Sequence, residues 1–329
     1  MNNWEIFGHD WAVEMLQQQV VNANLRHAYL LTGSAGVGRR TLAIRLAQAL
    51  ICTNPLAPGV PCRTCRTCKQ IDSGQHPDLL VIKKQTDKKD LIVEQVREVS
   101  KFLSLKPYMA AYKIVLITNF EDANASAQNA LLKTLEEAPD FAILLLTAEN
   151  GEQLLPTIVS RCEVVRLRPL KVDLVSDFLV SRGIAGPAAS LYAHLADGRP
   201  GYALHLSTDT HSLSFRTEKL DDLNKLLAAR LRDRIQYAEK LVKDKDVFRK
   251  TLFIWLSYWR DVLMKTSGAT APLTNIDRAD DIETLSYKLD INTARIITVA
   301  VEKAIDMLDR NVNPRLLAEV TLMDWPRVK

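Results

Sequence analysis

The chain has 329 residues, of which 47% are hydrophobic and 25% are charged, with a formal net charge of +4. This length is too great for one small core and suggests two or three globular domains. The mild positive charge neither demands nor excludes a nucleic-acid partner, because the basic residues are spread along the chain. Met1–Glu5 shows none of the charge and hydropathy pattern of a secretory signal, and the most apolar stretch, 142–148, is far shorter than the roughly 20 residues of a membrane helix.

Short apolar runs alternate with helical patterns in the first half of the chain. A strand over residues 28–31 runs into a glycine-rich turn, and a helix follows over 41–51. Further apolar runs at 79–82, 114–117 and 143–146 indicate buried strands, and a helix over 126–137 separates the last two. Continuous apolar strands separated by helices predict a parallel sheet that is covered on both faces.

After residues 168–170 the sequence shows helical periodicity and no strand signal. Helices over 172–182 and 188–196 form a small predicted unit, which we expect the segment Gly198-Arg199-Pro200-Gly201 to close. The region from about residue 211 to the end is also helical, with a loop over 266–280. Its most distinctive helix, 247–264, carries an apolar stripe that we interpret as core and not as an aromatic ligand platform. The stripe consists of Phe248, Leu252, Trp255, Leu256, Trp259 and Leu263.

The turn after the first strand has the glycine spacing of a phosphate-binding loop. Gly33, Gly36 and Gly38 lie between a strand and a helix, so backbone N–H groups and the helix N-terminus can face a phosphate. A working site continues with Lys and then Ser or Thr, whereas this chain has Arg39 and Arg40. The guanidinium does not fit the slot of a lysine ammonium, and the hydroxyl that should hold Mg²⁺ is absent at 40.

The strand over 114–117 resembles a Walker B strand without its acidic residues. Thr118 and Asn119 stand where one carboxylate should support Mg²⁺ and the next should orient the attacking water. Glu121 and Asp122 lie beyond the strand end, and we interpret them as a cap region of the following helix. We therefore expect no functional ATP or Mg²⁺ site in this chain; phosphate binding without hydrolysis and an ordinary strand-to-helix loop stay open.

Four cysteines predict a structural metal site. Cys52, Cys62, Cys65 and Cys68 have the spacing Cys-x9-Cys-x2-Cys-x2-Cys, in which four thiolates can close a tetrahedral shell around Zn²⁺. The proline- and glycine-containing segment between them has little else to hold it, so the ion would supply order. A reactive thiol cluster, an iron–sulfur site and a nucleic-acid-reading zinc module using Arg63, Arg66 and Lys69 are the alternatives. Cys162 is too far along the chain to be a fifth ligand, and this cysteine usage suggests a cytoplasmic protein.

Two further motifs carry a resemblance to a known family. The segments Asn129–Glu137 and Pro156–Cys162, the second ending in Ser160-Arg161-Cys162, are similar to the clamp-loader branch of the AAA+ ATPases. The match extends to 311–317, Asn-Val-Asn-Pro-Arg-Leu-Leu, and with the cysteine insertion it covers essentially the whole chain. In that family the arginine of the Ser-Arg-Cys turn, here Arg161, projects into the ATP site of the next subunit.

The resemblance implies a fold of three parts. These are an α/β P-loop (AAA+) domain with a parallel sheet over 1–167, which holds the zinc-binding insertion 52–68, a small helical lid over 168–207, and an all-α collar over 208–329 that joins subunits into a ring. Gly201 stands where an active lid offers a phosphate-sensing arginine, and Arg199 comes two positions early. Together with residues 39, 40, 118 and 119, this departure implies a subunit that does not hydrolyse ATP.

The resemblance also implies partners and a process. The partners are the ATPase gamma or tau subunits, a delta subunit and, through them, the sliding clamp and primer–template DNA, with no membrane. The chain would be a non-catalytic subunit of a DNA-directed DNA polymerase holoenzyme, with Arg161 as its arginine finger in trans. An independent P-loop ATPase and a zinc-dependent nucleic-acid-binding module are the rival functions.

Overall fold

The computed structural model describes residues 4–84, 91–310 and 312–328. The chain forms two compact units. Unit 1 contains residues 1–178 and 198–202, and unit 2 contains residues 179–197 and 203–329. The boundary passes through α7 (Val172–Ser181) and α9 (Pro200–Thr208). Within the described residues, every helix is too short or too polar to serve as a membrane span.

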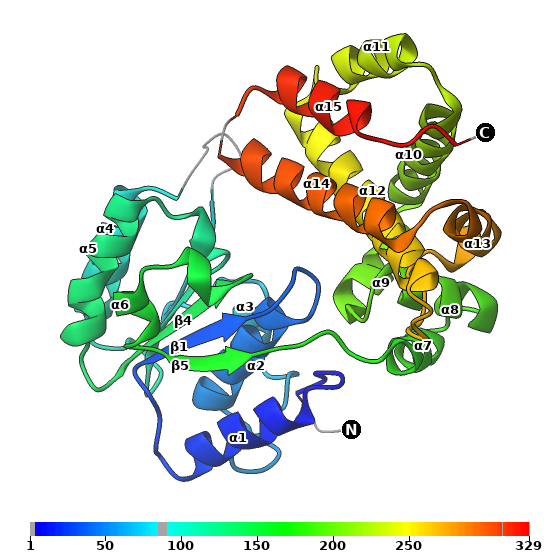
Figure 1. The fold of residues 1–329 in the computed structure, drawn as a ribbon. Helices are drawn as coiled ribbons and strands as arrows, with labels where there is room; N and C mark the ends of the chain where they lie inside the picture. Colours follow the sequence, from blue (N-terminus) through cyan, green and yellow to red (C-terminus); the bar gives the residue numbers. More distant parts are fainter. Residues whose placement is uncertain (1–3, 85–90, 311, 329) are drawn as a thin grey trace. The chain divides into compact units, whose positions relative to one another are not determined.

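Unit 1 is built on one parallel sheet (Figure 1). Its strands are β1 (Ala28–Thr32), β2 (Leu79–Ile82), β3 (Lys113–Ile117), β4 (Ala142–Ala148) and β5 (Glu163–Arg166). They lie in the order β2-β3-β4-β1-β5, and every neighbouring pair is parallel. The prediction of a parallel sheet is confirmed. The strand β1 that precedes the glycine turn lies inside the sheet, between β4 and β5.

Both faces of the sheet are buried, as the unbroken apolar runs predict. Tyr29 and Leu31 of β1 face one core, whereas Ala28 and Leu30 face the other, because successive side chains of a strand point to opposite sides. Helices α1 and α2 cover the first face, and α4, α5 and α6 cover the second (Figure 1). All strands except β2 and β5 are buried along their whole length.

The helices of unit 1 include four that the sequence pattern did not single out. They are α1 (Asp10–Val21), α2 (Arg39–Ile51), α3 (Arg66–Asp72), α4 (Val93–Leu103), α5 (Ala125–Glu136) and α6 (Pro156–Val159), with the short 3₁₀ helices η1 (Phe120–Asp122) and η2 (Gly151–Gln153). The predictions for 41–51 and 126–137 are confirmed within two residues. Helices α1, α3, α4 and α6 were not predicted.

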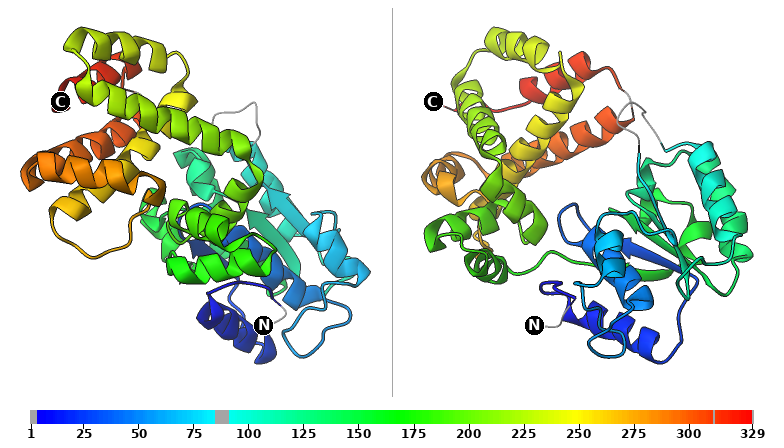
Figure 2. Two further views of the ribbon diagram at one scale, coloured as in Figure 1. Left: turned by 90° about the vertical axis from the view of Figure 1, so that its right-hand side faces the viewer. Right: turned by 180° about the vertical axis from the view of Figure 1, so that it is seen from behind.

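Unit 2 contains helices and no strand among its described residues (Figures 1 and 2). Beyond the ends of α7 and α9 these are α8 (Gly186–Leu195), α10 (Thr210–Ala228), α11 (Leu231–Leu241), α12 (Lys245–Thr266), α13 (Ala279–Lys288), α14 (Ile291–Asp309) and α15 (Pro314–Met323), with the 3₁₀ helix η3 (Ile276–Arg278). The helical prediction for this half is confirmed. The predicted loop over 266–280 lies between the end of α12 at Thr266 and the start of α13 at Ala279, and it contains η3.

The apolar stripe of α12 forms the centre of unit 2. Phe248, Leu252, Trp255 and Trp259 are at most 1% exposed, so the interpretation of the stripe as core is confirmed. The rings of Trp255 and Trp259 lie 4.9 and 5.7 Å from the ring of Trp325 in edge-on geometry. Such aromatic contacts add to the hydrophobic gain from burial and specify how the last residues pack onto α12.

The C-terminal motif begins a helix, and a buried arginine holds the end of that helix and the segment after it. Asn311 lies outside the described residues, but the side chain of Asn313 accepts hydrogen bonds from the N–H groups of Arg315 and Leu316 and thereby caps α15. Buried Arg234 on α11 donates to the carbonyl oxygens of Leu322 and Pro326 at 3.1 and 2.9 Å. The segment after α15 is therefore tied to α11.

Candidate functional site

The glycine turn opens α2 as a phosphate-binding loop should. It leaves β1 at Gly33, and α2 begins at Arg39 with Gly38 as its cap residue at a φ of 114°. Only glycine adopts that backbone conformation readily. The N-terminus of α2 directs unpaired backbone N–H groups toward this end of the sheet, where it can attract an anion.

A second segment of unit 1 packs onto this turn. The N–H group of Gly201 donates to the carbonyl oxygen of Gly36 at 2.8 Å. A Cβ atom at Gly36 would lie 2.8 Å from the backbone nitrogen of Tyr202, so the close approach requires glycine there. We expected the segment 198–201 to close a helical unit, and this was wrong: Pro200 and Gly201 begin α9 and contact the loop.

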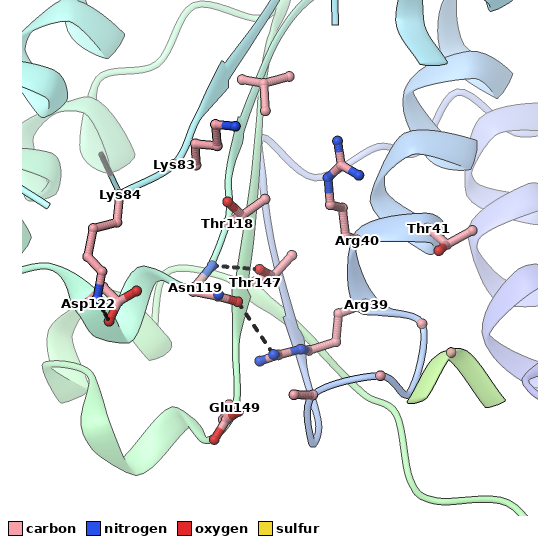
Figure 3. Close-up of a pocket in the computed structure, with 15 residues that line it drawn as sticks. Arg39, Arg40, Thr41, Lys83, Lys84, Thr118, Asn119, Asp122, Thr147 and Glu149 are labelled. Carbon is pink, nitrogen blue, oxygen red and sulfur yellow. Dashed lines mark hydrogen bonds and ion pairs between the residues drawn. The ribbon is translucent and has the colours of Figure 1, made fainter. Parts of the chain in front are cut away.

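A pocket of about 710 Å³ lies where the loop meets the carboxyl ends of the strands (Figure 3). Ligand sites of open α/β sheets usually occur at this edge. The pocket is lined by Ala35, Gly36, Gly38, Arg39, Arg40, Thr41, Val81, Lys83, Lys84, Thr118, Asn119, Asp122, Thr147, Glu149 and Gly201. The structure thus brings the predicted loop residues and the predicted strand-end residues into one place.

Arg39 turns from the loop toward the end of β3 (Figure 3). Its Nη2 atom donates to Oδ1 of Asn119 at 3.5 Å, and its Nη1 atom lies 3.8 Å from Oε1 of Glu121. The Arg39 side chain is only 7% exposed, and its Nη1 atom has no hydrogen-bond partner. The group that replaces the lysine of a working site therefore bridges α2 and the end of β3 within the protein.

Burial disfavours both charges of this pair. It lowers the pKa of the Arg39 guanidinium, against the opposing effects of Glu121 and Glu149. It also raises the pKa of the Glu121 carboxyl, against the effects of hydrogen bonding and of Arg39. At 3.8 Å the attraction is too weak to outweigh desolvation, so the pair is a poor source of stability by itself.

The uncharged residues at the end of β3 form hydrogen bonds with the neighbouring strands. Thr118 donates its hydroxyl to the carbonyl oxygen of Ile82 at 3.3 Å, and the N–H group of Asn119 donates to Oγ1 of Thr147 on β4 at 2.9 Å. Asn119 has a left-handed conformation with a φ of 51°, which asparagine tolerates better than most residues. These two residues connect three strands at the pocket.

Glu121 and Asp122 do not cap the next helix, and that interpretation was wrong. Both lie in η1, and Asn124 caps α5 by accepting a hydrogen bond from the N–H group of Ala127. Asp122 pairs with Lys84 at 3.1 Å. The N–H group of Glu149 donates to Oε1 of Glu121 at 3.1 Å, so this carboxylate joins the ends of β3 and β4.

Other pocket residues escaped the sequence-based reasoning. Lys83 and Lys84 follow β2, and Thr147 and Glu149 lie at the end of β4. The available signal was their position after apolar runs, since parallel strands end at one edge of the sheet. Arg40 is exposed, and Thr41 points away from Asn119 (Figure 3).

The four predicted cysteines form one cluster. Their sulfur atoms all lie within 4.8 Å of one another, with Cys52 at 3.5 Å from Cys62 and 4.0 Å from Cys65. Zn–S bonds of about 2.3 Å in a tetrahedron place sulfur atoms about 3.8 Å apart, so the donor set fits Zn²⁺. Cys162 lies outside this cluster.

Backbone donors favour thiolates at Cys62 and Cys65, whereas burial raises the pKa of Cys52 and of Cys68. The N–H groups of Cys62, Cys65 and Cys68 point at the sulfur atoms of Cys52, Cys62 and Cys65, at 3.4, 3.3 and 3.4 Å. Burial acts to raise the pKa of Cys62, but hydrogen bonds from Cys65 and Thr64 outweigh it and lower this pKa to about 6. Metal binding requires the deprotonated form.

The insertion has more support than its composition suggested. Nε1 of Trp4 donates to the carbonyl oxygen of Gly59 at 3.0 Å, so the expectation that little else holds this loop was wrong. Arg45 of α2 pairs with Asp72 at 2.9 Å, and Nε2 of Gln48 donates to the carbonyl oxygen of Cys68. The cluster is therefore fixed to α2, the helix that the phosphate loop begins.

Arg161 lies apart from the pocket residues in the sequence, on the turn between α6 and β5. Its side chain is 37% exposed. Nη2 lies 2.7 Å from Oε1 of Glu136 at the end of α5, and Nη1 donates to the carbonyl oxygen of Thr157 at 3.0 Å. The guanidinium is thus held on the surface by unit 1 and accessible to an external group.

The chain matches two protein families that share one description. Residues 8–171 match the family described as DNA polymerase III, delta subunit, and residues 211–327 match its C-terminal counterpart. A DNA polymerase III subunit delta′ from Pseudomonas aeruginosa is 30% identical, covering 96% of this chain and 97% of that protein. One from Bacillus subtilis is 28% identical, covering 93% of each.

A crystal structure of a DNA polymerase III gamma subunit-related protein from Thermotoga maritima is 18% identical, with a TM-score of 0.42. The alignment covers 96% of this chain and 99% of that one. The two family matches together cover most of both units, and the first one spans the residues of the phosphate loop, the cysteine insertion and the Ser-Arg-Cys turn of this chain. The chain therefore belongs to the family of DNA polymerase III delta′ subunits, within the clamp-loader group of AAA+ proteins that its motifs resemble.

Proposed function

We propose that this chain is the non-hydrolysing subunit of a replicative clamp loader, and that Arg161 completes the ATP site of a neighbouring subunit. One observation carries the proposal: the pocket's arginine is turned inward, whereas Arg161 is held on the surface. The partners would be gamma or tau and delta subunits in the cytoplasm, acting on the sliding clamp and primer–template DNA. The expected lid over 168–207 and collar over 208–329 belong to this proposal.

The chain's own pocket lacks the groups that ATP hydrolysis requires. Phosphoryl transfer needs a cation on the β- and γ-phosphates, a hydroxyl and a carboxylate for Mg²⁺, and a residue that orients water. Arg39 is directed to Asn119 and Glu121, and Arg40 stands in place of the hydroxyl. Of the two carboxylates that line the pocket, Asp122 is paired with Lys84, and Glu149 directly follows β4. These features support a scaffold role.

Arg161 would act electrostatically. Charge accumulates on the γ-phosphate oxygens in the transition state, and a guanidinium delivered from outside the site stabilises it. Arginine offers five N–H donors in a planar fork, which suits phosphate oxygens better than a lysine ammonium does. Two of the nitrogens already have acceptors in this chain, and both acceptors are at the surface, so phosphate oxygens can compete for them.

The test uses the isolated chain and the reconstituted complex. The isolated chain should show no ATP hydrolysis above background, and adding it to gamma or tau and delta should raise their turnover. The Arg161→Ala chain should enter the complex normally and fail to raise turnover. Hydrolysis by the isolated chain would instead support the rival P-loop ATPase, and tight, salt-sensitive DNA binding by the chain alone would support the rival zinc module.

Zn²⁺ is the metal that the cysteine cluster fits best. Four sulfur donors leave no open position for water, so the ion would be structural and would hold residues 52–68 against α2. Metal analysis of the reduced protein should find about one zinc ion per chain. Chelation should loosen this segment without changing nucleotide chemistry, and reduced protein without zinc would refute the site.

A further inference from the structure

The guanidinium of Arg161 has two partners in its own chain. Glu136 accepts from Nη2 at 2.7 Å, and the carbonyl oxygen of Thr157 accepts from Nη1 at 3.0 Å. Because the guanidinium is planar, two fixed nitrogens define the orientation of the whole group. Its position on the surface is therefore specified by contacts and does not depend on the backbone turn alone.

Both partners belong to a rigid part of unit 1. Oε1 of Gln128 on α5 accepts a hydrogen bond from the N–H group of Leu155, directly before α6, at 2.9 Å. Leu135 of α5 and Ile158 of α6 are at most 2% exposed and belong to the same core cluster. An arginine held between these two helices is thereby fixed relative to the sheet.

Glu136 occupies a position that is unfavourable for its own helix. It is the last residue of α5, where the helix dipole places partial negative charge, so a carboxylate there costs stability. Its pair with Arg161 is half exposed, and such pairs contribute little to folding. The stability of α5 does not explain a glutamate at this position, whereas the contact with Arg161 does.

We infer that Glu136 is a positioning residue that orients Arg161 toward the neighbouring ATP site. The inference rests on the proposed function of Arg161. A free arginine side chain samples many rotamers and loses that entropy when it binds a phosphate. Glu136 and Thr157 limit the rotamers beforehand, and the exposed carboxylate gives way to a triphosphate at small cost because solvent screens the pair.

Glu136→Gln in the reconstituted complex tests this role. The amide keeps the shape but loses the charge, so kcat for ATP hydrolysis should fall about two- to fivefold, the size expected for an exposed ion pair. KM should change little, because Arg161 acts mainly on the charge that develops in the transition state. The matched control is Glu137→Gln, which removes the same charge at the same helix end. Glu137 pairs with Lys133 at 3.9 Å, so kcat should not change.

Ionic strength provides a second readout that a purely structural role would not affect. Salt screens an exposed pair within a Debye length of about 8 Å at 0.15 M. The ratio of wild-type to Glu136→Gln kcat should therefore fall toward one as salt is raised. The ratio of wild-type to Glu137→Gln kcat should stay near one throughout.

An unchanged or increased kcat in Glu136→Gln would overturn the inference. Arg161→Ala, measured in parallel, distinguishes failure of the proposed function from failure of the positioning role. If Arg161→Ala leaves kcat unchanged, the proposed function fails. If Arg161→Ala lowers kcat and Glu136→Gln does not, only the positioning role fails. If the Glu136→Gln chain does not enter the complex, ¹⁵N relaxation of the Arg161 side chain in the isolated chain tests whether Glu136 restricts that side chain. The Arg161 signal is identified as the one that disappears in Arg161→Lys. Faster Nε motion in Glu136→Gln supports the role, and unchanged motion contradicts it.

Discussion

Two arginines of unit 1 occupy opposite surroundings. Arg39 is 7% exposed, and its guanidinium faces Asn119 and Glu121 of the same unit. The Arg161 side chain is 37% exposed and has only surface partners, Glu136 and Thr157. The same side chain is therefore a fixed internal bridge at one site and an accessible donor at the other.

Under the proposed function, the two arginines would show how an ATPase fold can keep one half of its chemistry. A pocket arginine that is used internally cannot follow the phosphates of a bound nucleotide. An arginine at the edge of the same sheet needs no functional pocket in its own chain, only a scaffold that holds its turn. The pocket can thus lose its catalytic groups while the fold that presents Arg161 persists.

After removal of the Arg161 side chain, the largest expected effect comes from its conservative replacement. Arg161→Lys keeps the charge but loses the planar fork, so ATP turnover in the complex should fall about 10- to 100-fold. Arg39→Lys should leave turnover nearly unchanged, because this side chain faces its own chain. Steady-state ATPase rates of the two complexes measure the difference. Equal losses in the two variants would contradict the different roles assigned to Arg39 and Arg161.

For the stability of the isolated chain, a change at Arg39 should have a larger effect than a change at Arg161. Arg39→Ala removes the partner of Glu121, whose side chain is only 15% exposed, and should lower the free energy of unfolding by about 2 kcal/mol. Arg161→Ala removes only an exposed pair and should change it by less than about 0.5 kcal/mol. Urea denaturation of the isolated chain measures both values.

A paired change sharpens this prediction. Because burial opposes both charges, Arg39→Met combined with Glu121→Gln should recover most of the stability lost in Arg39→Ala. Arg40→Ala at the exposed neighbouring position is the control and should have little effect. A double variant as unstable as Arg39→Ala would show that packing, and not the unpaired carboxylate, causes the loss.

The smallest expected effect is a pH dependence due to Glu121. Burial raises its pKa in the folded chain, so the folded state holds a proton that the unfolded state has lost. The resulting stabilisation is complete below the unfolded value of 4.5 and is lost as pH rises through the folded pKa. Relative to Glu121→Gln, the wild type should gain stability as pH is lowered toward 4.5. A difference that is constant with pH would contradict the assignment.

The sequence predicted those parts of the fold that local patterns determine. Unbroken apolar runs identified β1 to β4, and the glycines before Arg39 identified the loop that opens α2. β5 was not predicted, because a four-residue edge strand with one fully buried residue carries little pattern. The α12 stripe was strong because its aromatic residues repeat with the helical period.

The side-chain contacts of the site could not be predicted in the same way. Arg39 meets Glu121 across 82 residues of sequence, and Gly201 meets Gly36 across 165. Such contacts follow from how strands and helices pack, which hydrophobic periodicity does not encode. The cysteine cluster was accessible to prediction because its ligand spacing is local, whereas the partner of Arg161 was not.

The central claim is that this chain supplies the arginine for ATP hydrolysis in a neighbour's site. Single-turnover ATP hydrolysis in the reconstituted complex tests it most directly, with Arg161→Ala compared with wild type and with Arg166→Ala at an exposed arginine of β5 as the control. The account predicts a loss on the order of 10³-fold at the affected site for Arg161→Ala and almost none for the control. Equal rates for wild type and Arg161→Ala in a fully assembled complex would contradict it.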